Sequence, residues 1–232
     1  MTIRINRKIV ACGVKDPSTD EAIEVTPEHA AAEQNVVQMH EKLERPESLI
    51  GETYKIKTPQ SDHALYVTIN DIVLNPGTEH ELRRPFEIFI NSKNMDHFQW
   101  IVALTRIISA VFRKGGDVTF LVEELHSVFD PRGGYFKKGG RFVPSLVAEI
   151  GDVVEQHLIR IGILKPAELD QHQKAFIAEK RAEFDNRMNG SADNDGQQFP
   201  DAAVLCKKCM TKAAILLDGC LTCLNCGESK CS

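Results

Sequence analysis

The sequence predicts an α+β fold: a small antiparallel sheet followed by packed helices, with a flexibly tethered C-terminal zinc ribbon. Three observations predict this fold. Short segments of alternating apolar and polar residues lie between about residues 50 and 90, and segments with helical spacing follow them up to about residue 188. Six of the seven cysteines then stand close together, from Cys206 to Cys231.

The composition is that of a globular protein with an ordinary core. Of the 232 residues, 42% are hydrophobic and 26% are charged, and the net charge of −5 argues against non-specific binding of nucleic acid. The first residues lack the apolar run of a secretory signal, and the most apolar stretch, Phe98–Phe112, is short for a membrane span and contains Arg106. We expect a cytoplasmic protein with no membrane partner, whose cysteines bind metal or react instead of forming a structural disulfide framework.

Residues 1–48 are expected to form an N-terminal extension. Weak alternation predicts a strand within Thr2–Val14, and Thr26, followed by a proline, starts a helix predicted to reach Leu43. The apolar face of that helix is thin, so it needs a partner surface or is mobile. Cys12 stands alone in an apolar stretch, where a cysteine is typically a buried small side chain.

An α+β core domain is expected over residues 49–165. Its first part contains three segments of alternating apolar residues that follow one another closely, which predicts an antiparallel meander. The strands are expected to include Tyr54–Thr58, Leu65–Leu74 and Phe86–Ile90, with a turn at Asn75-Pro76-Gly77.

Four helices are expected after the sheet. The first ends at a Lys-Gly-Gly sequence, and the second starts at Asp117, a favourable N-cap. Residues 130–140 are expected to be a loop, and the basic, glycine-rich stretch Arg132–Arg141 is a candidate contact for a phosphate or a partner subunit. The helices are predicted over Asp96–Arg113, Asp117 to about Val128, Pro144 to about Ile161, and Pro166 to about Met188.

The last of these helices, residues 166–188, is so heavily charged that we expect it to face solvent or to act as a connecting arm. Residues 189–201 are polar and predict a flexible linker, which spans roughly 20 Å on average. The linker tethers the cysteine-containing module, residues 202–232, without fixing its position.

The spacing of the cysteines in this module is typical of a zinc site. Two C-x2-C sequences separated by a short hairpin bring four thiolates together, and zinc prefers four such ligands in a tetrahedron. A bound metal supplies the folding free energy that so small a module lacks. Strands of the hairpin are expected within Ala213–Leu217, before a turn at Asp218-Gly219. The six cysteines are Cys206, Cys209, Cys220, Cys223, Cys226 and Cys231.

Because four ligands suffice, two cysteines are left over, and the spacing allows two partitions. In either partition Cys231 is spare, and its place next to the end of the chain suits thiol–disulfide exchange, where access decides the rate. The positive charge of the neighbouring Lys230 favours the thiolate form of Cys231. The preferred partition assigns Cys206, Cys209, Cys220 and Cys223 to zinc and leaves Cys226 and Cys231. The other takes Cys223 and Cys226 as the second pair of ligands and leaves Cys220 with Cys231.

The cysteine pattern, ending in the sequence Cys-Gly-Glu-Ser-Lys-Cys at residues 226–231, resembles the C-terminal tail of class II, adenosylcobalamin-dependent ribonucleotide reductases. Upstream stretches are similar to the domain just before that tail, and the resemblance covers most of the chain beyond residue 45. The Thr-Ser-Cys-Pro-Asp string that names this domain in many relatives is absent. The similar stretches are Arg45-Pro46, Gly51–Ile56, Arg84–Ile90 and Arg113-Lys114-Gly115-Gly116.

The resemblance implies the small, accessory subunit of a split ribonucleoside-diphosphate reductase, because the chain is too short for the ten-stranded barrel that carries the radical chemistry. The barrel and adenosylcobalamin are then expected on a catalytic partner subunit, and Zn²⁺ on this chain. In the family, a pair of tail cysteines re-reduces the active-site disulfide and is itself reduced by thioredoxin or glutaredoxin. Carried over by motif, the redox pair is Cys226 and Cys231, with Cys206, Cys209, Cys220 and Cys223 for zinc.

Two other functions are alternatives: a zinc ribbon that binds nucleic acid, and an interaction or regulatory protein without a redox role. Residues 201–232 carry four lysines against three acidic residues and no aromatic residue for stacking on bases, so no direct contact with nucleic acid is expected. The regulatory alternative predicts that Cys231→Ser is harmless. His97, His126 and His157 fall in expected helices and are interpreted as packing or surface residues instead of catalysts.

Overall fold

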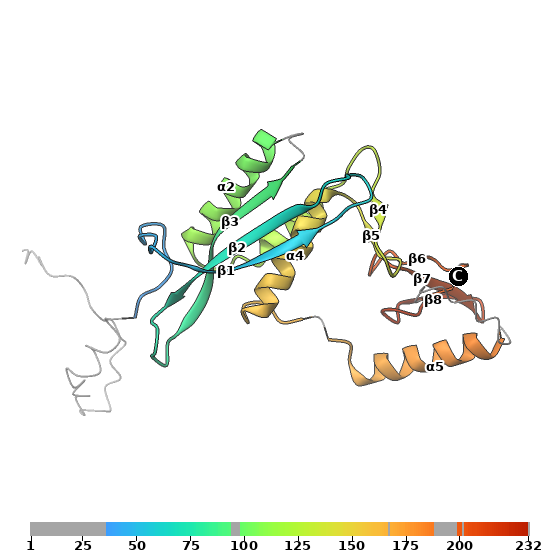
Figure 1. Ribbon diagram of the computed structural model, residues 1–232. Helices are drawn as coiled ribbons and strands as arrows, with labels where there is room; N and C mark the ends of the chain where they lie inside the picture. The colour runs from blue at the N-terminus through green and yellow to red at the C-terminus, as the bar shows by residue number, and fades with distance from the viewer. Residues whose placement is uncertain (1–35, 94–97, 167, 188–198, 201, 232) are drawn as a thin grey trace, which may run out of the picture. The chain divides into compact units, whose positions relative to one another are not determined.

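The computed structural model describes residues 36–93, 98–166, 168–187, 199–200 and 202–231, and it confirms the α+β class (Figure 1). The strand expected within Thr2–Val14, Cys12 and the first part of the helix expected from Thr26 lie outside the described residues. Within the described part, no helix is both long and apolar enough to cross a membrane.

The end of that expected N-terminal helix is not helical, which corrects the prediction for residues 36–43. The Asn75 side chain holds this segment by two hydrogen bonds: it accepts from the Val37 N–H at 2.8 Å and donates to the Val37 carbonyl at 2.9 Å. Met39 and Leu43 pack against a small cluster of buried residues from the sheet. Tertiary contacts therefore override the local preference for helix here.

The sheet consists of three antiparallel strands in the order β1-β2-β3, as the alternation predicted. The apolar residues at alternate positions point to one face, where they are buried, because successive side chains in a strand point to opposite faces. A register shift lies between Asn70 and Asp71 of the middle strand. The strands are β1 (Ile50–Ile56), β2 (Leu65–Leu74) and β3 (Leu82–Ser92).

Three helices pack on the buried face of this sheet: α2 (Phe98–Lys114), α3 (Phe120–His126) and α4 (Leu146–Arg160). Gly115 and Gly116, with φ of 82° and 77°, follow α2 as predicted. The N-cap of the second helix is Thr119, two residues later than expected, and the Asp117 carboxylate accepts hydrogen bonds from the Thr119 N–H and hydroxyl in the preceding turn. The shared core contains Val67, Ile69, Ile88, Ile108, Phe112, Val122, Leu125, Ile150, Val154 and Leu158.

Gly151 lets α3 and α4 approach each other closely. A Cβ atom at this position would lie only 2.8 Å from Cδ2 of His126. Glycine has a low preference for helix and weakens α4 locally, but the close packing of α3 against α4 requires it at this position. At the start of α4 the Ser145 hydroxyl accepts from the Ala148 N–H at 3.0 Å and caps the helix.

The stretch expected to be a loop is irregular except at β4 (Tyr135–Phe136), which pairs with β5 (Phe142–Val143) in a short hairpin. Two of its cations form ion pairs with acidic residues of α4. Lys137 Nζ lies 2.8 Å from Oε1 of Glu149, and Arg141 Nη2 lies 2.6 Å from Oδ1 of Asp152. Lys137 and Arg141 are therefore neutralised within the domain. At the tip, the Gly140 carbonyl accepts from the Lys212 N–H at 2.8 Å.

The cysteine-rich module is a four-stranded antiparallel ribbon in the order β6-β7-β8-β9. The turn between β7 and β8 is at Asp218-Gly219, with φ of 51° and 82°, as predicted. The strands are β6 (Val204–Leu205), β7 (Lys212–Leu217), β8 (Cys220–Cys223) and β9 (Ser229–Cys231).

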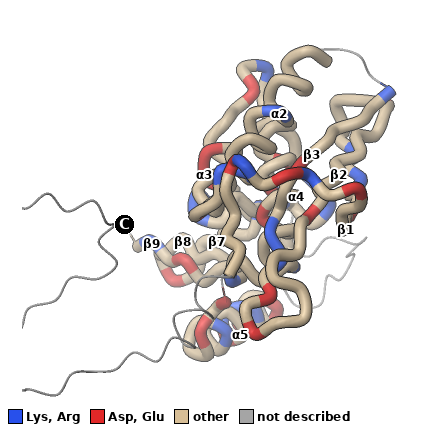
Figure 2. The backbone as a smooth tube through the Cα atoms, turned by 90° about the vertical axis from the view of Figure 1, so that its left-hand side faces the viewer, with Lys and Arg blue, Asp and Glu red and all other residues tan. Residues whose placement is uncertain are grey.

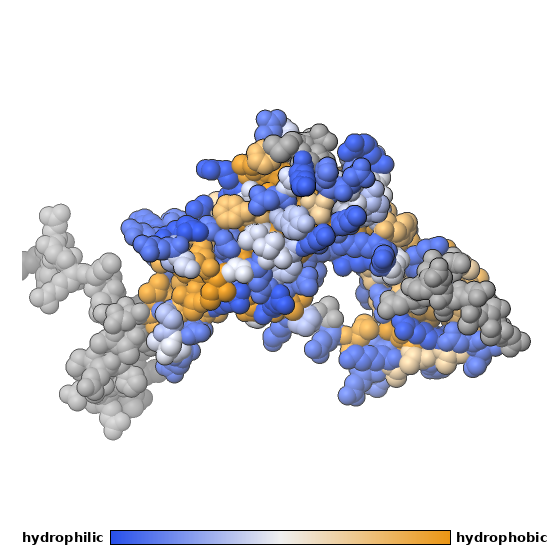
Figure 3. Space-filling model, viewed as in Figure 1, coloured by the Kyte–Doolittle hydropathy of each residue, from blue (hydrophilic) through white to orange (hydrophobic). Residues whose placement is uncertain are grey.

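The charged helix α5 (Gln171–Arg187) is exposed along most of its length, as expected, and one side of it contacts the ribbon. Arg181 Nε donates to the Leu224 carbonyl at 3.0 Å, and its guanidinium lies 5.4 Å from the centre of the Phe199 ring. Phe184 packs against the buried ribbon residues. Figure 2 shows residues of both charges along α5, and hydrophilic side chains cover much of the visible surface in Figure 3. The core of the ribbon itself is therefore formed by residues 199–224, with Phe184 of the helix at its side.

Candidate metal centre and cysteine pair

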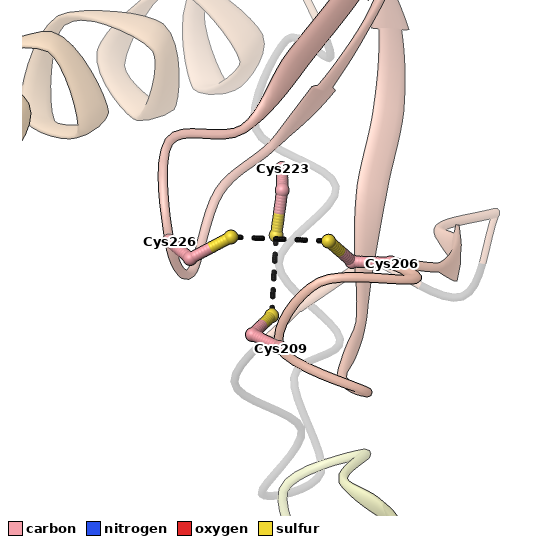
Figure 4. A group of neighbouring side chains, drawn as sticks. All are labelled: Cys206, Cys209, Cys223 and Cys226. Carbon is pink, nitrogen blue, oxygen red and sulfur yellow. Dashed lines mark hydrogen bonds between the residues drawn. The ribbon is translucent and has the colours of Figure 1, made fainter.

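Four cysteines of the ribbon converge on one point (Figure 4). All four sulfur atoms lie within 4.8 Å of one another. The Sγ atoms of Cys206 and Cys226 are 3.8 Å apart, and those of Cys209 and Cys223 are 3.7 Å apart. A tetrahedron with zinc–sulfur bonds of about 2.3 Å has edges of about 3.8 Å, so the four residues fit a zinc ion.

Two similar turns position these ligands. Cys206 and Cys209 lie in the turn between β6 and β7; Cys223 is the last residue of β8, and Cys226 lies in the turn that leads to β9. In each turn the residue after the second cysteine has a left-handed backbone: Met210 with φ of 51° and Gly227 with φ of 72°. This conformation bends the chain so that both sulfurs of a turn face the same point, and glycine adopts it without strain.

Three of the four thiols have shifted pKa values. Burial raises the pKa of Cys223 and of Cys226, so neither is readily a thiolate without a positive charge nearby. Burial also raises the pKa of Cys209, but hydrogen bonds from Asn225 and Thr211 outweigh it and lower the pKa to about 7. A metal ion bound by these residues would displace the remaining protons, since zinc binds thiolates.

The remaining two cysteines of the ribbon, Cys220 and Cys231, form a disulfide. They lie directly opposite each other on β8 and β9. Cys231 is exposed and Cys220 is half-buried. Because β9 is the last strand of the ribbon, the disulfide lies at an edge of the sheet.

This arrangement corrects the preferred partition of the cysteines, which grouped Cys220 with the ligands and paired Cys226 with Cys231. Cys220 and Cys223 are both in strand β8. Residues three apart in a strand point to opposite faces, so these two sulfurs do not meet at one metal. The structure matches the other partition. The glycine after Cys226 is the sequence signal for the second metal-binding turn, because that position requires the left-handed backbone.

Two of the described histidines take part in polar networks. His157 is buried, with Nε2 2.8 Å from Oδ1 of Asp71 and Nδ1 2.9 Å from the Tyr54 hydroxyl. Arg83 also binds Asp71, so this network joins all three strands to α4. His126 pairs with Asp152, whose carboxylate two cations already neutralise. His97 lies outside the described residues.

Residues 37–158 match the family model of the TSCPD domain, which is over half of the chain. The chain belongs to the TSCPD-domain family. The TSCPD domain is found in adenosylcobalamin-dependent ribonucleotide reductases, which supports the resemblance at the level of the family. It spans the segment before β1 and the sheet with α2, α3 and most of α4, and it ends before α5 and the ribbon. Comparisons with curated proteins and with solved structures gave no match.

Proposed function

We propose that this chain is the accessory subunit of an adenosylcobalamin-dependent ribonucleoside-diphosphate reductase in the cytoplasm, and that its ribbon carries electrons to the active site of a separate catalytic subunit. The supporting observation is a disulfide-bonded cysteine pair, the half-buried Cys220 and the exposed Cys231, at the edge of a ribbon that follows a TSCPD domain. The pair is separate from the four cysteines that fit a metal.

In the reduced form, the Cys231 thiolate attacks one sulfur of the oxidised active-site pair, and the other active-site sulfur leaves as a thiolate. Cys220 then attacks Sγ of Cys231, and the first active-site sulfur is released. Two electrons have moved to the catalytic subunit, and Cys220–Cys231 is a disulfide again. A protein dithiol such as thioredoxin or glutaredoxin restores the pair. Cys231 is the first nucleophile because it is the exposed member.

The four-cysteine site has a structural role in this proposal. Zinc bound to Cys206, Cys209, Cys223 and Cys226 supplies folding free energy to the ribbon. Cys223 is the last residue of β8, and Cys226 lies in the turn that leads to β9. The site thereby holds the two strands that carry the cysteine pair in register, while no redox step passes through the metal.

Turnover by the complex with the catalytic subunit tests the proposal. Cys231→Ser is expected to reduce turnover supported by thioredoxin to background, because the exchange step loses its nucleophile. Turnover supported by dithiothreitol is expected to persist, because a small dithiol reaches the active site directly. Cys12→Ser, the same change at the lone cysteine, is the matched control and is expected to keep both activities. Equal activity of Cys231→Ser and wild type with thioredoxin contradicts the redox function.

A further inference from the structure

The tip of the β4–β5 hairpin pairs with the first metal-binding turn of the ribbon. The Phe142 N–H donates to the Met210 carbonyl at 2.6 Å, and the Lys212 N–H donates to the Gly140 carbonyl at 2.8 Å. The two residues between these bonds, one from each segment, form an antiparallel bridge. This is the hydrogen-bond pattern of two adjacent antiparallel strands, so the TSCPD domain and the ribbon are joined here by backbone pairing.

The same segment of the ribbon shapes the metal site. Met210, with its left-handed backbone, directly follows the cysteine Cys209 of that site. Thr211 is buried, its carbonyl accepts from the Cys206 N–H at 2.9 Å, and its hydroxyl donates to the Cys209 carbonyl at 3.1 Å. The backbone that directs the sulfurs of this turn toward the metal therefore also sets the directions of the Met210 carbonyl and the Lys212 N–H.

The hairpin is fixed on the side of the TSCPD domain. Arg141, whose backbone forms the bridge to Thr211, binds Asp152 of α4 through its guanidinium. Lys137 binds Glu149 of the same helix, and the Lys137 N–H donates to the Arg141 carbonyl at 2.8 Å. Helix α4 belongs to the main core of the domain. These bonds fix the groups that meet the ribbon relative to that core.

The contact lies at the opposite end of β7 from the disulfide. Lys212 is the first residue of β7, whereas Leu217, which pairs with Cys220, is the last. Strand residues rise about 3.4 Å each, so the two ends are about 17 Å apart. Cys231 is exposed while the contact is formed. The hairpin therefore holds the ribbon without covering the cysteine pair.

We propose that this contact couples metal binding to docking of the ribbon: the hairpin tightens metal binding, and the ribbon docks on the TSCPD domain when the metal is bound. The metal fixes the turn that offers the Met210 carbonyl, and the hairpin fixes the same turn from outside. Such coupling is reciprocal, so each event strengthens the other by the same factor. Groups that orient metal ligands from outside typically change the affinity by about 10–100-fold. The inference needs the metal site but not the electron transfer of the proposed function.

The first test measures the zinc affinity of the full-length chain by competition with a chromogenic chelator. Phe142→Pro removes one N–H donor of the contact. Gly140→Val places a branched side chain beside Lys212 at a φ of 78°, which strains a β-branched residue. Both variants are expected to bind zinc about tenfold more weakly than wild type. The matched control is Lys138→Pro, which puts proline in the turn of the same hairpin ahead of the left-handed Gly139, where proline fits. It is expected to keep the wild-type affinity.

Hydrogen exchange of backbone amides measures the reverse effect. With zinc bound, the Phe142 N–H is expected to exchange slowly, and after zinc removal much faster, because its acceptor is on the ribbon. The Lys137 N–H of the same hairpin donates to Arg141 and is expected to keep its protection, so the hairpin itself stays folded.

Wild-type zinc affinity for both Phe142→Pro and Gly140→Val overturns the coupling, and so does equal weakening by Lys138→Pro. A Phe142 amide whose exchange is the same with and without zinc also overturns it. Helical circular dichroism equal to wild type shows that the domain is folded in each variant. The proposed function stands or falls separately, because Cys231→Ser tests it without altering the hairpin.

Discussion

Replacing Cys226 by serine is expected to release the metal and unfold the ribbon, whereas replacing Cys220 by serine is expected to leave both unchanged. Cys226 is one of the four sulfurs that fit a tetrahedral site, and Cys220 is bonded to Cys231 instead. Structural zinc sites in small modules contribute about 10–16 kcal/mol to folding. A module with so small a core does not fold without that contribution.

Zinc content per chain and protease sensitivity of the ribbon check this prediction. Wild type and Cys220→Ser are expected to hold one zinc and to resist cleavage after the ribbon lysines. Cys226→Ser is expected to hold none and to be cleaved there, while the TSCPD domain stays folded on its own core. Retention of zinc by Cys226→Ser together with its loss from Cys220→Ser would restore the partition that the spacing alone favoured.

Replacing Asp71 by alanine is expected to destabilise the TSCPD domain by about 3–5 kcal/mol, the usual cost of removing one partner from a buried ion pair. The Asp71 side chain has no exposed surface. It accepts a hydrogen bond from Arg83 Nε at 2.8 Å, and its other oxygen lies 2.8 Å from Nε2 of the buried His157. Without the carboxylate, both groups lose their shared partner inside the domain.

The midpoint of denaturant unfolding, followed by helical circular dichroism, measures this effect. Asp62→Ala provides the matched control, because Asp62 is exposed, and its free energy of unfolding is expected to stay within about 0.5 kcal/mol of wild type. An equally small effect for Asp71→Ala would show that the network contributes little to the stability of the domain.

The sheet and the first three helices could be predicted from the sequence, because their apolar periodicity agrees with the burial that tertiary packing gives them. Val67 and Ile69 alternate on the buried face, and Ile108 and Phe112 lie on one side of α2. The position of α5 could not be predicted in this way, because it has no continuous apolar face. It binds the ribbon through a few side chains, such as Phe184 and Arg181, whose partners are distant in sequence.

The module of six cysteines was predictable from the sequence. The spacing alone did not predict correctly which four cysteines cluster as metal ligands and which two form the disulfide. A C-x2-C sequence was interpreted as a turn wherever it occurred, yet Cys220 and Cys223 lie within strand β8. Two physical facts decide the division. A strand separates residues three apart onto opposite faces, and a metal-binding turn needs a residue with positive φ after its second cysteine, which Gly227 provides.

The central claim is that four cysteines of the ribbon hold a metal while Cys220 and Cys231 exchange electrons. Mass spectrometric mapping of alkylated thiols on the native chain, before and after incubation with reduced thioredoxin, tests it directly, with zinc quantified in the same samples. The account predicts that thioredoxin makes Cys220 and Cys231 newly alkylatable, while one zinc per chain is retained and the other four ribbon cysteines stay protected. New labelling at Cys226, or loss of zinc on reduction, would contradict it.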